Sequence, residues 1–445
     1  MATYSTLRKP ARVLPLAFFS FIVIGTFLLS LPVSQAGEGR APFLVALFTA
    51  TSAACVTGLT VVDTHTYWSP FGQVVLLLLF ETGGLGVMVL ATLLVMAVSR
   101  RLGLSVRLLA QAATQTSALG EARQVVVRVA ITMLIFQSLL AALLTARLMV
   151  GYDYPLGKAL WYGVFHAVSA FNNAGFTLYD DSLTGFVSDP WICLTVAAGV
   201  IVGGVGFPVI FELQRQFRHP SSWSMHTKVT LLGTAILLLV GMAAVLGLEW
   251  SNPATLGPLR TPDKLLAAFF QGMTPRSAGF HTVDYSAMSV ETYLVTIALM
   301  FIGGGSASTA GGIKLTTFFL LAFVIWAEAR GEPDVVVFQR RLAQGVQRQA
   351  LAVALLSVAV VGLGTLMALI MTNLSLQDAM FEVTSAATTT GLSTGITTEL
   401  PTPALVLLVV LMYLGRVGTI TVAAALALRS RQRLYRLPEE RPIVG

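Results

Sequence analysis

The chain has 445 residues, of which 55% are hydrophobic and only 11% are charged. Soluble globular proteins contain about 45–50% apolar and about 25% charged residues, so this composition excludes a disordered chain and an ordinary soluble enzyme. The two cysteines, Cys55 and Cys193, are too few for a disulfide framework or a cysteine-rich metal site. We therefore predict an all-α polytopic membrane protein.

A helix needs about 20 apolar residues to cross the hydrocarbon core of a bilayer. Eight runs qualify, at 13–31, 71–98, 125–150, 190–211, 229–248, 292–326, 350–372 and 403–428. The sixth run is too long for one span and contains ten small residues in a row, so we expect a helix that is broken there. Four shorter apolar segments separate the spans of successive pairs, at 42–54, 157–171, 264–274 and 376–388.

The distribution of basic residues predicts the orientation of the chain. If the four short segments re-enter the membrane without crossing it, 20 of the 28 Lys and Arg residues lie on one side. Basic loops stay on the cytoplasmic side, so both termini, including the tail 429–445, are predicted to be cytoplasmic. This rule also explains the net charge of +7 without a nucleic-acid partner.

A fourfold repeat appears when the chain is aligned on Gly58, Gly175, Gly279 and Gly391, each of which closes one short segment. Leu or Phe follows each glycine, and Phe48, Phe165, Phe269 and Phe381 stand ten residues before it. Six residues before it stand Ser52, Ser169, Met273 and Ser385. We predict four span–loop–span repeats, at 13–98, 125–211, 229–326 and 350–428, around a pseudo-fourfold pore.

The glycine loops contain few charged residues, which argues against an anion pore or a calcium pore. Backbone carbonyls remain, and rings of carbonyls replace the hydration shell of a monovalent cation. The alternative is that the glycines only allow the loops to pack closely. The candidate ion-binding residues are Val56, Thr57, Gly58, Asn173, Ala174, Gly175, Ser277, Ala278, Gly279, Thr389, Thr390 and Gly391.

These features resemble the Trk/Ktr/HKT superfamily of potassium transporters. The resemblance is carried by VTGLTVVDT, FHAVSAFNNAGF, TPRSAGF, GGGSASTAGGIKLTT and GRVG, and it covers nearly the whole chain. Within the superfamily it is strongest to the membrane subunits of bacterial Ktr systems. It implies potassium uptake across a bacterial inner membrane, a homodimer with one pore per protomer, and a cytoplasmic ring of nucleotide-binding regulatory subunits (KtrA). It implies no organic cofactor, and it leaves sodium dependence open.

The resemblance also implies a gate below the glycine loops, formed by an intramembrane loop and a pore-facing arginine. The gate residues are Gly303, Gly304, Gly305, Ser306, Ala307, Ser308, Thr309, Ala310, Gly311 and Gly312, together with Lys314 and Arg416. Two alternatives stay open: the small residues could serve helix packing, and Arg416 could form an ion pair with Glu81 or Glu382.

Other polar residues near the glycines suggest supporting roles. Asp63, Asp180 and Asp284 follow three of the glycines, where they would concentrate cations or cap the next helix. Arg276 is expected to pair with an acid, and His166 to be a packing residue.

Two other protein classes are weighed. An intramembrane protease using Ser306 lacks the HExxH and GxSxG motifs and an opposed His–acid pair. A secondary transporter would be built from two inverted repeats, whereas this chain shows four direct ones.

Overall fold

The computed structural model describes residues 10–101 and 118–418, and almost all regular structure in these ranges is helical. The helices in the predicted spanning runs are α2 (Pro10–Leu29), α5 (Pro70–Arg101), α7 (Ala118–Tyr152), α9 (Pro190–Val205), α11 (Met225–Glu249), α13 (Val290–Phe301), α14 (Leu315–Ala329), α15 (Gln344–Met371) and α17 (Thr402–Tyr413). The predicted tail 429–445 and the end of the run 403–428 lie outside the described residues.

Four further helices of 12 to 17 residues, here named the short helices, stand between these where the sequence predicts non-spanning segments. They are α3 (Phe43–Ala54), α8 (Leu156–Asn172), α12 (Thr261–Met273) and α16 (Leu376–Ala387). Each packs against its flanking helices: α3 against α2 and α5, α8 against α7 and α9, α12 against α11, and α16 against α15 and α17. The C-terminal half of each short helix is almost entirely buried, so these helices form the centre of the molecule.

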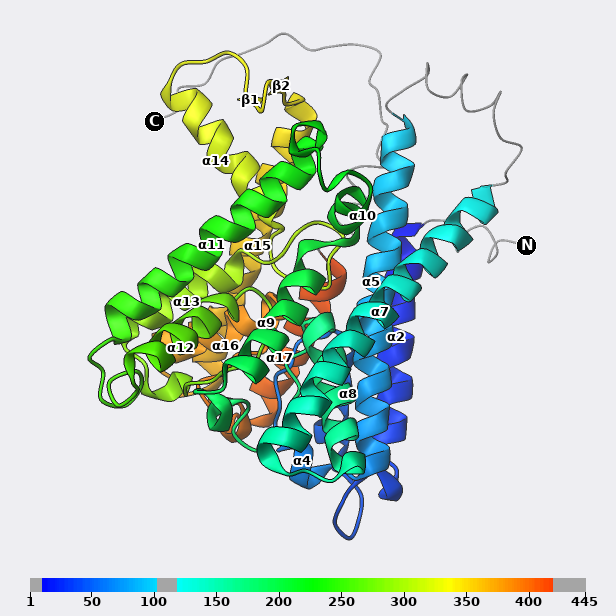
Figure 1. Cartoon of the computed structure of the whole chain (residues 1–445), viewed down its shortest axis with the longest axis vertical. Helices are drawn as coiled ribbons and strands as arrows, with labels where there is room; N and C mark the ends of the chain where they lie inside the picture. Colours follow the sequence, from blue (N-terminus) through cyan, green and yellow to red (C-terminus); the bar gives the residue numbers. More distant parts are fainter. Residues whose placement is uncertain (1–9, 102–117, 419–445) are drawn as a thin grey trace.

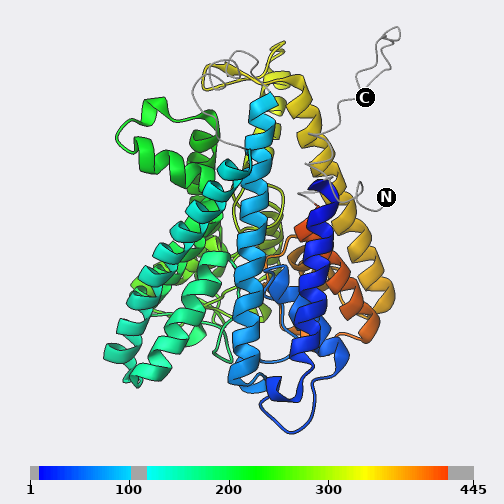
Figure 2. The same ribbon diagram turned by 90° about the vertical axis from the view of Figure 1, so that its right-hand side faces the viewer.

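The helices run between two ends of the molecule (Figures 1 and 2). At one end lie the last turns of α5 and the antiparallel hairpin of β1 (Val336–Val337) and β2 (Arg340–Arg341). At the other end lies α4 (Thr64–Tyr67), which follows the first glycine loop. In the described ranges three helices are long and apolar enough to span a membrane, at Gln124–Tyr152, Met225–Glu249 and Gln344–Met371.

Two predicted spans are broken in the structure. The run 292–326 is interrupted between α13 and α14, which confirms the expected break at the small residues. The run 190–211 is predicted as one helix but consists of α9 and α10 (Phe207–Gln216), which meet at an angle of 97°. Gly206 lies at this bend with a φ of +98°, a backbone conformation that residues with a Cβ atom rarely adopt.

Candidate functional site

The four glycine loops share one backbone conformation. Each glycine has a positive φ, from +72° at Gly175 to +95° at Gly58. The residue two positions earlier is also left-handed in every loop, although none of the four is glycine: Val56, Asn173, Ser277 and Thr389. Such residues cost roughly 1–3 kcal/mol each and persist only where the surroundings enforce them. The same strained pattern in four loops points to a shared function.

The four glycines also lie next to one another, in the order 58, 175, 279 and 391, and the last returns to the first. A Cβ atom built on Gly58 would lie 2.5 Å from the carbonyl oxygen of Ala174, and one on Gly391 would lie 2.0 Å from that of Thr57. The corresponding oxygens of Ala278 and Thr390 lie 3.1 Å and 2.9 Å from such atoms on Gly175 and Gly279. The carbonyls that precede the glycines therefore form a closed ring.

Hydrogen bonds to the short helices hold this ring from the outside. The amide of the residue before the glycine donates to a carbonyl near the end of its own short helix: Thr57 to Ser52 at 2.8 Å, and Thr390 to Ser385 at 2.9 Å. These bonds hold each loop against the end of its own short helix. The equivalent bonds of the other loops join Ala174 to Ser169 and Ala278 to Thr274.

Hydroxyl groups at the ends of the short helices fix the loops in two ways. The Oγ atoms of Ser52 and Ser385 accept a hydrogen bond from the amide of Gly58 and of Gly391, both at 3.1 Å. In the second and third loops, Ser169 and Thr274 instead donate to the carbonyls of the phenylalanines that follow the glycine, Phe176 and Phe280. The sequence shows a repeated serine at this place but gives no sign of the two bonding modes.

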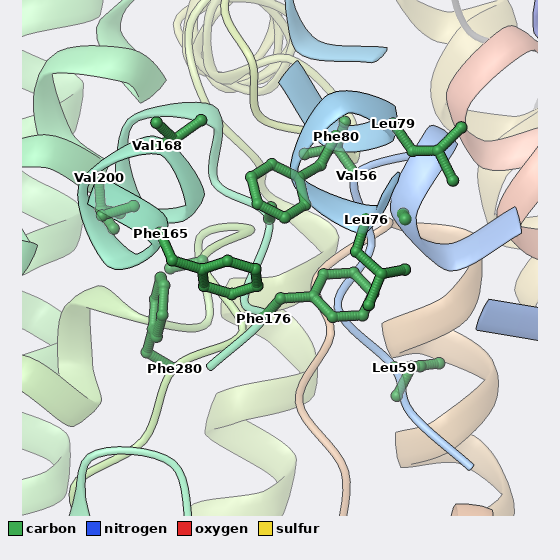
Figure 3. Close-up of a cluster of buried hydrophobic side chains, with 14 of the residues drawn as sticks. Val56, Leu59, Leu76, Leu79, Phe80, Phe165, Val168, Phe176, Val200 and Phe280 are labelled. Atoms are coloured by element: carbon green, nitrogen blue, oxygen red, sulfur yellow. The ribbon is translucent and has the colours of Figure 1, made fainter. Parts of the chain in front are cut away.

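The third repeat is shifted by one residue from the gapless sequence alignment. Thr274, and not Met273, has the role of the serine, and Phe270, and not Phe269, is fully buried like Phe48, Phe165 and Phe381. Aromatic side chains also pack behind the ring, where Phe80 of α5 meets Phe165 and Phe176 with ring centroids 5.5 Å and 5.9 Å apart (Figure 3).

A cavity of about 310 Å³ lies on one side of the ring, and residues that follow the four glycines in the sequence line it. Its lining includes all four glycines together with Asp63, Asp180 and Asp284. Asp63 accepts hydrogen bonds from Thr66 and Asp284 accepts from Ser286, so these two acids also cap short helical turns. His281 lies in the same lining, and burial lowers the pKa of its ring.

The loop Gly303–Gly312 lies on the opposite side of the ring, because it contacts the residues that precede the glycines. The amide of Gly311 donates to Ser277 Oγ at 2.8 Å, and this hydroxyl donates to the carbonyl of Thr389 at 2.7 Å. Thr309 lies 3.2 Å from Asn173 Oδ1. The loop Gly303–Gly312 and three of the four glycine loops are thus joined through side chains.

The same loop is tied to the bend between α9 and α10. The amide of Gly305 donates to the carbonyl of Gly204 at 2.8 Å, and the amide of Phe207 donates to Ala307 at 3.3 Å. A Cβ atom at Gly206 would lie 2.5 Å from the carbonyl oxygen of Ser306, so the bend depends on glycine.

The two predicted gate cations both bind the backbone of this loop. Arg416 is only 2% exposed and donates from Nη1 to the carbonyl of Thr309, while Lys314 donates to that of Ala310 at 2.6 Å. Neither acid proposed as a partner of Arg416 bonds to it in the described ranges. Glu81 instead accepts from Gln137 and Asn172, and Glu382 accepts from Ser393, Thr394 and Thr397.

Two supporting predictions have different outcomes. Arg276 is buried, and its hydrogen bonds in the described part of the chain go to Thr234, so the expected acidic partner is wrong there. His166 is a buried, hydrogen-bonded residue, as expected: Nδ1 lies 2.7 Å from the carbonyl of Tyr162.

Comparison with known proteins identifies the relatives of this chain. Residues 5–434 match the model of the family described as TrkH, cation transport protein. The chain is 40% identical to Ktr system potassium uptake protein B of Bacillus subtilis, over 98% of this chain and 97% of the relative. It is 38% identical to the Vibrio alginolyticus protein of the same name, over 98% and 94% of the two chains.

Two further comparisons agree. Identity to the potassium/sodium uptake protein NtpJ of Enterococcus hirae is 34%, over 98% of this chain and 97% of the relative. The fold is similar to the crystal structure of the potassium transporter TrkH from Vibrio parahaemolyticus, with a TM-score of 0.69 and 18% identity. That match covers 93% of this chain and 85% of the other.

Proposed function

Because the chain belongs to the TrkH family of cation transport proteins, we propose that it takes up potassium through a pore lined by its four glycine loops. Membership of this family makes the chain a multi-pass membrane transporter and not an enzyme. Relatives named as potassium uptake proteins, at 38% and 40% identity, support potassium as the cargo.

The observation that carries this proposal is the closed ring of carbonyls. Four backbone oxygens, those of Thr57, Ala174, Ala278 and Thr390, each lie beside the glycine of a neighbouring loop. Carbonyl oxygens are suited to replace the water around a monovalent cation. The acidic cavity on one side of the ring would concentrate cations before they enter.

The loop Gly303–Gly312 would act as the gate on the other side of the ring. Its position is supported by the contacts of Gly311 and Thr309 with the ring loops. Arg416 would place a positive charge below the ring, where it raises the energy of a passing cation, and Lys314 would hold the loop in place.

The proposed topology has eight spans in four repeats, with the boundaries 13–98, 125–211, 229–326 and 350–428. The ends of α5 and α14 lie at the same end of the molecule as the β1–β2 hairpin, and this end would face the cytoplasm together with both termini. The acidic cavity would then open to the outside.

Two protein partners belong to the proposal. Relatives named as components of a Ktr system suggest that the chain works with other subunits. We propose a homodimer in the inner membrane and a separate cytoplasmic nucleotide-binding subunit, which would dock on the loops 215–228 and 330–348 and on the partly described loop 100–124. Potassium would be the only cofactor, and no nucleic acid would bind.

Growth complementation tests the main proposal. The chain should restore growth of a potassium-uptake-deficient bacterium at low external potassium. A truncated chain should not restore it. A well-expressed chain in the membrane that restores neither growth nor rubidium uptake would overturn the proposal. Co-purification with a soluble nucleotide-binding subunit, and sensitivity of transport to ATP and ADP, test the regulatory part separately.

A further inference from the structure

We propose that Glu382 is a positioning residue that holds the segment after the glycine of the fourth loop by accepting a hydrogen bond from its backbone. His166 and Gln271 hold the second and third loops in the same way, and we call this contact the clamp. This inference rests on the proposed function, because it assigns these residues to the selectivity of the ring.

Glu382 lies on α16 and is only 2% exposed. Its Oε1 atom accepts a hydrogen bond from the backbone amide of Thr394 at 3.1 Å and one from Ser393 Oγ. Its Oε2 atom accepts from Thr397 Oγ1 at 2.8 Å. One buried carboxylate therefore fixes three residues of the segment that leaves the ring, and Ser393 and Thr397 also line the acidic cavity.

The second loop has the same bond from a different side chain. His166 stands nine residues before Gly175, as Glu382 stands nine before Gly391. Its Nε2 atom accepts from the amide of Leu178 at 3.2 Å, and Leu178 is the third residue after the glycine, like Thr394. Since Nδ1 lies 2.7 Å from the carbonyl of Tyr162, it carries the ring proton, which leaves Nε2 as the acceptor.

The third loop uses an amide. Gln271 stands eight residues before Gly279, in line with the one-residue shift of this repeat. Its Oε1 atom lies 3.4 Å from the amide of Thr282, the third residue after the glycine, and its Nε2 donates to the carbonyl of Val283 at 2.8 Å. In three loops, the amide of the third residue after the glycine thus donates to a side chain of the short helix. The three acceptors differ chemically, so the loops share the hydrogen bond and not a residue type.

The first repeat differs. Thr49 occupies the place of His166 and Glu382, but its buried hydroxyl has no hydrogen-bond partner in the described part of the chain. A threonine side chain is also shorter than the other three. The ring is therefore clamped on three sides.

A clamp at this place matters because each loop is strained. The residue two before the glycine and the glycine itself are both left-handed, so the loop relaxes unless both of its ends are held. The hydroxyls of Ser52 and Ser385 hold the glycine itself, and those of Ser169 and Thr274 hold the phenylalanine that follows it. In three of the loops, the bond donated by the amide three residues beyond the glycine holds the far end. Functional groups must stay within about 0.5 Å of their working positions, which requires such support.

The competing explanation for Glu382 is its negative charge, which would attract cations to the mouth of the pore. Two substitutions separate the explanations. Glu382→Gln removes the charge and keeps an oxygen that accepts the Thr394 amide, whereas Glu382→Met keeps the length of the side chain and removes the acceptor.

The experiment uses the full chain in liposomes and compares potassium with sodium flux for the wild type and both variants. We expect Glu382→Gln to keep the potassium preference within about twofold, and Glu382→Met to lower it at least about fivefold, as the loss of hydrogen bonds to a buried carboxylate would do. If both variants lose potassium preference equally, the charge of Glu382 matters and the clamp is wrong. If neither variant loses potassium preference, Glu382 has no role in selectivity.

A second measurement does not depend on transport. Hydrogen exchange of the segment 393–397 should be at least about fivefold faster in Glu382→Met than in Glu382→Gln, while the segments after Gly58 and Gly175 stay unchanged. Equal exchange in the two variants would show that Glu382 does not hold this segment. If the wild type selects no potassium, the proposed function fails on its own, and the exchange result still decides whether the clamp exists.

Discussion

The four glycine loops and the loop Gly303–Gly312 are both irregular backbone inside a helical protein, but they are held in opposite ways. Each glycine loop is fixed mainly by its own short helix, through a backbone bond and a hydroxyl a few residues away. The loop Gly303–Gly312 does not follow a short helix of this kind. Beside local bonds, such as those of Gly303 with Ile313 and of Lys314 with Ala310, it depends on bonds to distant segments such as Gly204, Ser277 and Arg416. Local support suits a rigid ring, whereas scattered support suits an element that moves.

The largest effect is expected from Gly391→Ser. The new Cβ atom would lie 2.0 Å from the carbonyl oxygen of Thr57, and a φ of +88° adds strain. The strain costs roughly 1–3 kcal/mol, and the clash displaces the backbone of the ring. Because a tenfold change in relative affinity corresponds to about 1.4 kcal/mol, we expect the preference for potassium over sodium to fall at least about tenfold. Potassium and sodium uptake in liposomes measure it.

Gly39→Ser is the matched control for this variant. Gly39 has a φ of +116°, but a Cβ atom there meets nothing within 4 Å. It therefore adds the backbone strain without the clash. If Gly391→Ser selects potassium as well as this control does, the ring is not rigid and the contrast between the two kinds of loop fails.

The second prediction concerns the movable loop. Deletion of Ser306–Ser308 removes the contact of Ala307 with Phe207 but keeps the residues that touch the ring. If the loop blocks the path, the maximal rate of potassium uptake should rise about threefold or more, even without a regulatory subunit. A folded deletion variant with wild-type flux would reduce this stretch to a packing element.

Arg416→Ala is expected to have a smaller effect. Breaking a buried ion pair costs about 3–5 kcal/mol, but in the described ranges Arg416 bonds to a backbone carbonyl and to no acid. The variant should therefore fold, melt within a few degrees of the wild type, and carry potassium at an equal or higher maximal rate. Melting temperature and flux are measured on one purified sample. A stable variant with reduced flux would contradict the barrier.

The smallest effect is expected from Ser277→Ala, which removes the hydroxyl shared by the two kinds of loop. Its bonds to Gly311 and Thr389 are worth about 0.5–1.5 kcal/mol each. At the lower end of this range we expect about a twofold change in flux together with a small loss of selectivity. Ser306→Ala, which loses a bond to Thr316 only, is the control. Identical behaviour of the two variants would show that the ring and the gate are not coupled through Ser277.

The contrast between the two kinds of loop also explains what the sequence could predict. Gly58, Gly175, Gly279 and Gly391 were predictable because four copies of a weak pattern reinforce one another. The break at Gly303–Gly312 was predictable from composition. The partners of this loop were not, because its bonds to Asn173, Ser277 and Gly204 join segments far apart in the chain and leave no periodic signal.

Two errors have a common cause. The run 190–211 is apolar throughout, so hydropathy gave no sign that Gly206 bends it. A gapless alignment of the third repeat matches Phe269 and Met273 with residues of the other repeats, whereas Phe270 and Thr274 have these places in the structure. The bend at Gly206 and the one-residue shift of the third repeat each depend on the backbone at a single position. Hydropathy and residue spacing do not detect a change of that size. The clamp residues His166, Gln271 and Glu382 were missed as a set because they share a role and not a side chain.

The contact between Gly391 and Thr57 has a consequence for synthesis of the protein. It joins the last loop to the first, so the ring closes only after residue 391 has left the ribosome. Chains fold from the N-terminus as they emerge, and the first three loops must wait without their closing neighbour. A premature stop anywhere before the fourth repeat therefore removes one whole wall of the ring, even when three quarters of the chain is intact.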